Sequence, residues 1–126
     1  MIGGSGRGPT LALVTTYVSD DEMRAGLATA KVYSAVILVA GPNFGTPEAQ
    51  PIIWEHARRN FGLRADGLLN IVCPVGDDTE VCGISIFDLD VEATRAVMDE
   101  DPGVQAGVFT YQVHPVRSFP GDSLAR

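Results

Sequence analysis

An uninterrupted apolar run at residues 35–40, which ends at Gly41-Pro42, constrains the fold more than any other feature. A short run of this kind that stops at a turn is typical of a strand buried on both faces. Residues 10–18 and 80–89 also carry apolar side chains on both faces. A sheet that is covered by helices on one face needs another cover for the second face. A second copy of the sheet would supply it, so we expect a homodimer.

Helix signals separate these strands. Ser19 and Glu22 form the pattern of a capping box, which predicts a helix to about residue 33 that buries Met23 and Leu27. Residues 47–62 predict a second helix, and residues 68–75 and 80–89 predict two strands around a turn. We expect a third helix and a last strand to follow, at residues 91–100 and 108–114.

This order predicts a single α+β domain over residues 1–126. Residues 10–18 and 35–40 would be the first two core strands, and residues 47–79 would be an insertion between the second and third core strands. Without the insertion the plan is the ferredoxin-like βαββαβ arrangement. We expect residues 1–9 to be disordered and residues 115–126 to form a C-terminal tail.

Composition excludes several classes of protein. The net charge is −7, and the one adjacent basic pair is Arg58-Arg59, so nucleic acid is not an expected partner. No stretch approaches the roughly 20 apolar residues of a membrane helix, and the Gly-rich start has no signal-peptide core, so we expect a cytoplasmic protein. Cys73 and Cys82 are too few for a disulfide framework, and we expect them to face each other across the turn.

Short motifs in the C-terminal third resemble those of the YCII-related family. They are Asp101-Pro102 followed by Ala106-Gly107, together with Ala40-Gly41-Pro42 upstream. The resemblance covers most of the chain except about residues 46–79. It implies a dimeric α/β barrel with a pocket between helices and sheet. Some relatives are linked to dehydrochlorination of small hydroxylated aromatic compounds, and many have no known activity.

The resemblance also implies a catalytic pair, which consists of a His on the first helix and the Asp of the Asp-Pro motif. Asp101 matches the second member. The first member aligns with Gly26, so the pair is expected to be broken. His56, in the expected insertion, could replace the missing His if that helix lies over the pocket. His114, on a polar strand face with Gln112, is a second candidate.

Each candidate also has a plain structural interpretation. Asp101 could bond only local backbone at a turn, and His56 could be an exposed helix residue. His114 could simply end its strand. Three aromatic residues are candidates for substrate binding: Trp54, Tyr33 and Tyr111. Each could equally be a packed side chain of the core.

Two main functions follow. The first is a small-molecule enzyme of the lyase or isomerase type, which uses acid–base chemistry on a small aromatic or hydroxylated compound. The alternative is a non-catalytic ligand-binding or accessory protein that has lost the family's His, and a structural subunit is a third idea. The sequence shows no nucleotide fingerprint and no metal-ligand spacing, so no cofactor is expected.

Overall fold

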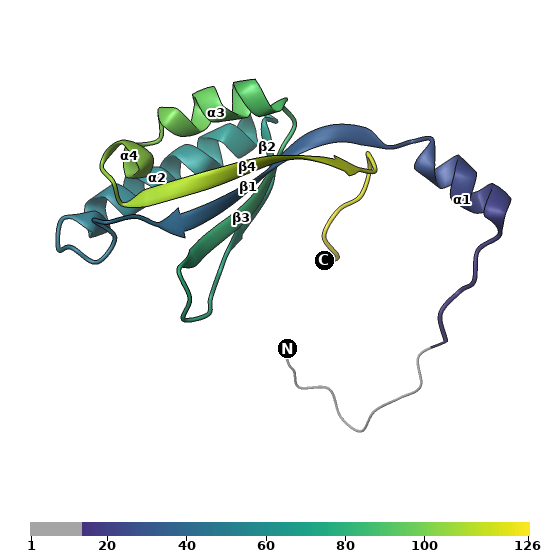
Figure 1. The fold of residues 1–126 in the computed structure, drawn as a ribbon, viewed down its shortest axis with the longest axis horizontal. Helices are drawn as coiled ribbons and strands as arrows, with labels where there is room; N and C mark the ends of the chain where they lie inside the picture. The colour runs from purple at the N-terminus through teal and green to yellow at the C-terminus, as the bar shows by residue number, and fades with distance from the viewer. Residues whose placement is uncertain (1–13) are drawn as a thin grey trace.

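In a computed structural model of the chain, residues 14–126 are described. Helices and strands alternate along this part of the chain (Figure 1). In chain order they are α1 (Asp20–Leu27), β1 (Lys31–Ala40), α2 (Ala49–Ala65), β2 (Leu69–Pro74), β3 (Val81–Phe87), α3 (Val91–Asp99), α4 (Pro102–Gln105) and β4 (Phe109–Ser118).

The described strands form one four-stranded antiparallel sheet in the order β2-β3-β1-β4. Together with α2 and α3 this is a βαββαβ unit whose strand order is that of the ferredoxin-like arrangement. Both helices lie on the same face of the sheet (Figure 1). The α+β prediction is therefore confirmed, and the ferredoxin-like plan is compatible with the observed sheet.

The core lies between that face and the two helices. Val36 and Leu38 of β1, Phe87 of β3 and Met98 of α3 are all buried in one cluster. Successive strand residues point to opposite faces, so the residues between them in β1, such as Ile37, point away from the helices. On this open face Ile84 stays largely exposed. The expectation that the central strands are apolar on both faces is confirmed.

The expected insertion is wrong. Residues 47–79 contain α2 and the edge strand β2, which are the first helix and the second strand of the βαββαβ unit itself. The error began at the expected first strand, because residues 14–18 form no strand and are exposed. Residues 10–13, like the expected disordered segment 1–9, lie outside the described residues. The first core strand is β1, which begins at Lys31 rather than residue 35.

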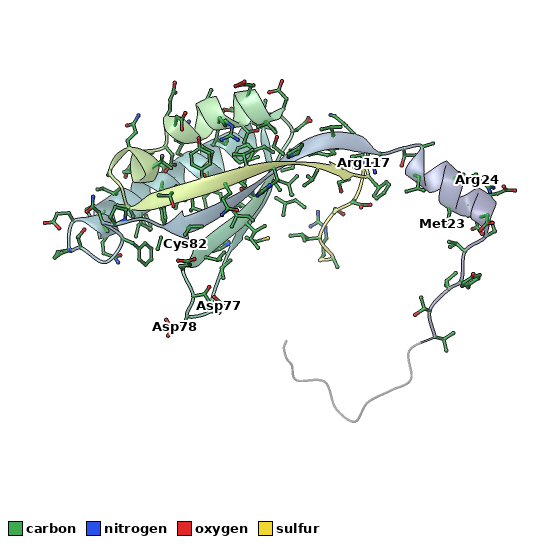
Figure 2. The ribbon with its side chains drawn as sticks, in the orientation of Figure 1. Met23, Arg24, Asp77, Asp78, Cys82 and Arg117 are labelled. Carbon is green, nitrogen blue, oxygen red and sulfur yellow. The ribbon has the colours of Figure 1, made fainter. Side chains whose placement is uncertain are left out.

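The predicted capping box is confirmed, but the predicted packing of its helix is wrong. The Ser19 hydroxyl accepts a hydrogen bond from the Glu22 amide, and the Glu22 carboxylate accepts one from the Ser19 amide. The helix ends at Leu27, and none of its residues is buried. Instead α1 projects from the end of the sheet, with Met23 and Arg24 far from the body (Figure 2).

The last strand is longer than expected and takes in the start of the predicted tail. Residues 115–118 pair with the first residues of β1, from Ser34↔Pro115 to Lys31↔Ser118. The tail therefore begins at residue 119. Its residues and Tyr33 line a hollow on the open face of the sheet.

Candidate functional site

Two residues from distant parts of the chain meet beneath the helices. His56 lies on the inner side of α2, and Asp101 immediately precedes α4. The Nδ1 atom of His56 is 2.8 Å from the Oδ1 atom of Asp101. Both side chains are buried, with 9% of His56 and 1% of Asp101 exposed. The sheet and the two helices therefore bring together the two residues that the sequence singled out first.

The Asp-Pro motif explains the position of the carboxylate. Asp101 is the N-cap of α4, where its Oδ2 atom accepts hydrogen bonds from the amides of Gly103 at 2.9 Å and Val104 at 3.2 Å. Pro102 occupies the first position of the helix, where its missing N–H has no cost. One carboxylate oxygen thus caps the helix, and the other faces His56. The expectation that Asp101 bonds only to nearby backbone amides is therefore correct for Oδ2 and wrong for Oδ1.

Close packing holds this corner in place. A side chain at position 103 would lie 2.5 Å from the Phe109 ring and 3.0 Å from Oδ2 of Asp101, so Gly103 is required there. Phe109 also packs against the His56 ring, with 4.7 Å between the ring centroids. In addition, a guanidinium nitrogen of Arg59 lies 3.7 Å from Oδ1 of Asp101 and balances its charge. These contacts leave the imidazole little freedom to rotate.

The hydrogen bonds define the tautomer of a neutral His56. A carboxylate has no proton to give, so Nδ1 must donate its proton to Asp101. The other ring nitrogen, Nε2, then carries a lone pair. The side-chain amide of Asn60 lies 3.3 Å from it and donates to it. A histidine with its proton fixed on Nδ1 and a lone pair on Nε2 can act as a base once a substrate displaces the Asn60 amide from that lone pair.

A cavity of about 210 Å³ lies beside this pair, between α2 and the strands β2 and β3. His56 and Asn60, whose side chains meet at Nε2, both line it. Apart from Cys73, Cys82 and Ser85, the rest of the lining is largely apolar and includes Leu38, Ile53, Phe87, Met98 and Phe109. The cavity can hold a small, mostly apolar molecule with its reactive group against Nε2.

No protein-family model matches the chain, and no curated protein matches its sequence. The geometry of the cavity therefore carries the functional argument.

The other predicted catalytic residue does not belong to this site. His114 alternates with Val113, which is buried on the helix side, so its ring points to the open face. There it is exposed and lies 3.3 Å from the Gln112 side chain. The sheet separates His114 from His56.

The three predicted substrate-binding aromatics are also placed outside the cavity lining. Trp54 lies on the outer side of α2 with 66% of its surface exposed. Tyr33 is buried on the open face beneath Lys31. Tyr111 donates a 2.6 Å hydrogen bond to Asp99 of α3, and burial is the main cause that raises the pKa of its hydroxyl.

The cysteines line the cavity but are not opposite each other, so that prediction is wrong. Cys73 pairs with Ile84, and the backbone amide of Val75 donates a hydrogen bond to the Cys82 carbonyl. The two cysteines are therefore diagonal neighbours on the two strands. Burial raises the pKa of the Cys82 thiol, which favours the protonated form over a nucleophilic thiolate. Figure 2 shows Cys82 near the turn that joins β2 and β3.

Sequence reasoning missed Asn60 and Arg59. Asn60 follows His56 by one helical turn, so the i, i+4 spacing could have placed both on the cavity side of the helix. No comparable signal was available for Arg59, because its contact with Asp101 depends on how α2 packs against α4. No cluster of three or more metal-ligating side chains occurs in the part of the chain that the structure describes. The same residues contain no helix long and apolar enough to cross a membrane.

Proposed function

We propose that the protein is a small-molecule enzyme of the lyase or isomerase type, in which His56 is the general base and Asp101 orients it. The observation that carries the proposal is the buried 2.8 Å contact between these side chains, which leaves Nε2 of His56 without a proton at the lining of a cavity, beside Asn60. A buried His–Asp pair at the lining of a concave pocket has the geometry of a base and the residue that orients it.

The chemistry follows from the tautomer. Nε2 of His56 accepts a proton from a carbon or oxygen atom of the substrate, and the ring becomes a cation next to the Asp101 carboxylate. Return of the proton to a neighbouring atom of the substrate would complete an isomerisation. Departure of a leaving group from the adjacent carbon would instead complete an elimination. The amides of Gly103 and Val104 hold the Asp101 side chain in place beside the ring.

The resemblance to the YCII-related family supports the same pair. That family's proposed residues are a His on the first helix and the Asp of the Asp-Pro motif. Gly26 lies on α1, outside the βαββαβ unit, whereas the first helix of that unit is α2, which carries His56. With this alignment both members of the pair are present. The earlier alignment of Gly26 with the catalytic His depended on a first strand that residues 14–18 do not form.

The same proposal includes a homodimer that closes the open face of the sheet as a dimeric α/β barrel. In its support, Ile37 and Ile84 lie on that face, on neighbouring central strands. A second sheet packed there would remove these side chains from water. The partners proposed are thus a second copy and a small-molecule ligand, in a cytoplasmic protein.

A non-catalytic ligand-binding role is the second candidate. The lining of the cavity favours it, because one polar cluster faces a mainly apolar wall, which suffices to orient a ligand. In this reading Asn60 and His56 would together hold one polar group of the ligand.

One experiment separates the two roles. A panel of small carbonyl and hydroxyl compounds is incubated in D₂O with the protein, and deuterium incorporation or elimination is followed by NMR. We expect a compound that binds to exchange a proton with the wild-type protein and to lose that exchange in His56→Gln. His114→Gln is the matched control, because this histidine lies on the other face of the sheet, and it should exchange at the wild-type rate. Binding without exchange would support the ligand-binding role, and exchange that persists in His56→Gln would exclude His56 as the base.

A further inference from the structure

Residues 14–30, here called the arm, carry several exposed apolar side chains. Met23 and Leu27 lie one turn apart on the same side of α1, and about half of each is exposed. Tyr17 and Val14, just before the helix, are almost fully exposed. Figure 1 shows α1 projecting from the end of the sheet, apart from the body. A short helix with one exposed apolar side is stable mainly when that side packs against a partner.

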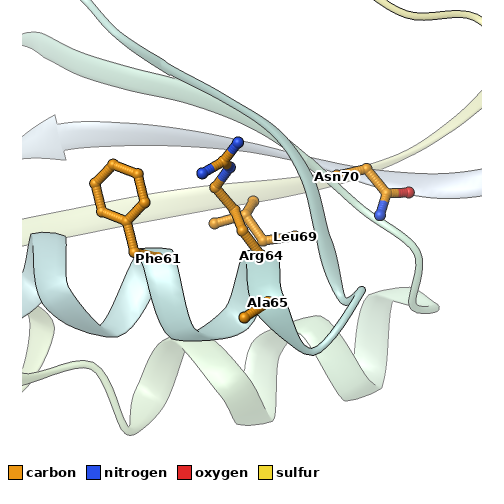
Figure 3. A pocket seen from close by; sticks show the side chains of 5 residues that line it. All are labelled: Phe61, Arg64, Ala65, Leu69 and Asn70. Atoms are coloured by element: carbon orange, nitrogen blue, oxygen red, sulfur yellow. The ribbon is translucent and has the colours of Figure 1, made fainter.

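A second uncovered apolar surface lies on the outer side of α2. We call it the α2 surface and define it by Trp54, Ala57, Arg58, Phe61 and Arg64. Two neighbouring hollows meet at Phe61, one of about 280 Å³ beside Trp54 and one of about 420 Å³ beside Arg64. Figure 3 shows Phe61 and Arg64 rising from the same side of α2. Trp54 and Phe61 are 66% and 64% exposed, and they lie two turns apart on the same helix.

The arm and the α2 surface match in charge as well as in polarity. α1 contains three acidic residues and one arginine, a net charge of −2, whereas the exposed charged residues of α2, which are Glu55, Arg58 and Arg64, have a net charge of +1. The acidic residues fill the first turn of α1, and Arg58 and Arg64 flank Phe61 on α2. Contact between the two helices would therefore bury apolar side chains between charges of opposite sign.

The joint between α1 and β1 holds the arm away from the α2 of its own chain. Only residues 28–30 connect the two elements, and backbone hydrogen bonds from Thr29 to Gly26 and from Ala30 to Leu27 keep this joint compact. The Thr29 hydroxyl adds a 2.7 Å bond to the same Gly26 carbonyl. The start of β1 is in turn fixed by the pairing of Lys31 with Ser118. Folding the arm back on its own body would break these bonds.

We propose that the arm of one chain docks on the α2 surface of a second copy, with Met23 and Leu27 inserted beside Trp54 and Phe61. The contact is reciprocal in a two-fold dimer, because each chain carries both surfaces. It is of the helix-in-groove kind, in which side chains one turn apart anchor an amphipathic helix. The proposal does not depend on the acid–base chemistry of His56.

Trp54 is the only tryptophan of the chain, so its fluorescence reports directly on the docking surface. In the experiment, a receiver chain carries Met23→Ser and Leu27→Ser and keeps Trp54. A donor chain keeps its arm and carries Trp54→Phe. Both are full-length chains, and neither set of substitutions touches a buried residue. The donor is titrated into the receiver, and Trp54 emission and acrylamide quenching are recorded.

We expect the donor to shift the Trp54 emission to shorter wavelength and to lower its quenching constant by half or more, because 66% of the side chain is exposed before docking. Donor that also carries Met23→Ser and Leu27→Ser should have no effect. Donor with Ala25→Ser, on the opposite side of α1, should act like the unmodified donor.

Two outcomes would overturn the proposal. Trp54 of the receiver could stay equally accessible to acrylamide at every donor concentration, which would show that the arm does not dock there in trans. Alternatively, Trp54 of the wild-type chain could be shielded to the same extent at all dilutions, and only in the presence of its own arm. That result would place the arm on the α2 surface of the same chain.

Discussion

The arm and the βαββαβ body are held together in opposite ways. α1 has strong local signals, with a complete capping box and acidic residues in its first turn, yet none of its residues is buried. α2 begins at Ala49, and its N-cap residue Glu48 makes no capping hydrogen bond, yet it is a 17-residue helix that buries His56 against the sheet. Local hydrogen bonds are thus enough to start a helix, whereas burial of apolar surface decides where a helix lies.

This contrast also separates the two proposals, which are the acid–base site and the docking of the arm. The acid–base site needs the body, because its two main residues come from α2 and from the turn before α4. The docking contact needs only exposed residues of the arm and of the outer side of α2. Mutations in the two regions should therefore affect different properties of the protein, and the following predictions test that separation.

The largest difference in unfolding free energy is expected between truncating a side chain of the core and truncating one of the arm. Phe87 is 1% exposed at the centre of the core, so Phe87→Ala should destabilise the fold by about 3–5 kcal/mol. Leu27→Ala should change the unfolding free energy of the body by less than about 0.5 kcal/mol, because Leu27 is 56% exposed and lies outside the core cluster. Urea unfolding at low protein concentration, where a dimer dissociates, measures both. Equal effects would show that α1 is part of the folded body.

The next effect concerns the carboxylate of the site. Asp101→Ala removes the acceptor of His56 and of the α4 amides, and we expect it to destabilise the protein by about 2–3 kcal/mol. Asp101→Asn keeps an acceptor for the amides but can donate to Nδ1, so it should move the His56 proton to Nε2. Nitrogen-15 NMR of the imidazole distinguishes the two tautomers. A proton that stays on Nδ1 in Asp101→Asn would contradict the role assigned to Asp101.

Substitution of one glycine in the body and one in the arm gives a matched comparison with smaller expected effects on stability. A Cβ atom at Gly41 would clash with the Gly107 carbonyl, so Gly41→Ala should destabilise the body by about 1–3 kcal/mol. No atom lies within 4 Å of a Cβ atom at Gly26, so Gly26→Ala should strengthen α1 by about 1 kcal/mol. Thermal unfolding reports on the first substitution, and amide hydrogen exchange in α1 reports on the second. The reverse order of effects would mean that α1 is more closely packed than the structure shows.

The smallest effect on the body is expected from the capping box. Ser19→Ala removes one cap and should increase amide exchange in α1 while the melting temperature of the body stays the same. Hydrogen bonds from Ser19 lower the pKa of Glu22. The stabilisation of α1 by Glu22 is therefore present above the ordinary pKa of glutamate and is lost as the pH falls through the lowered value. Amide exchange followed against pH should show this loss in the wild-type chain and in Ser19→Ala, which keeps the bond from the Ser19 amide, but not in Glu22→Gln.

Much of the site was visible in the sequence as residue types, but not as a site. Asp101 stood out through the Asp-Pro motif of the family resemblance, and His56 stood out as one of two histidines. Their contact could not be predicted, because 45 residues separate them and α2 was assigned to an insertion. Once α2 is the first core helix, the sheet places its inner side over β2 and β3, and His56 reaches Asp101.

The sequence by itself determined the α+β class, the capping box of α1, the strands β2 and β3, and the helix α3, because these depend on periodicity and on hydrogen bonds between near neighbours. The tertiary structure alone decided which strand comes first in the core. The apolar residues around Tyr17 suit a buried strand in isolation, but a strand needs a partner for its backbone, and β4 already occupies the edge of the sheet beside β1. Competition for sheet edges and for buried surface is a property of the whole chain, so no local pattern contains it.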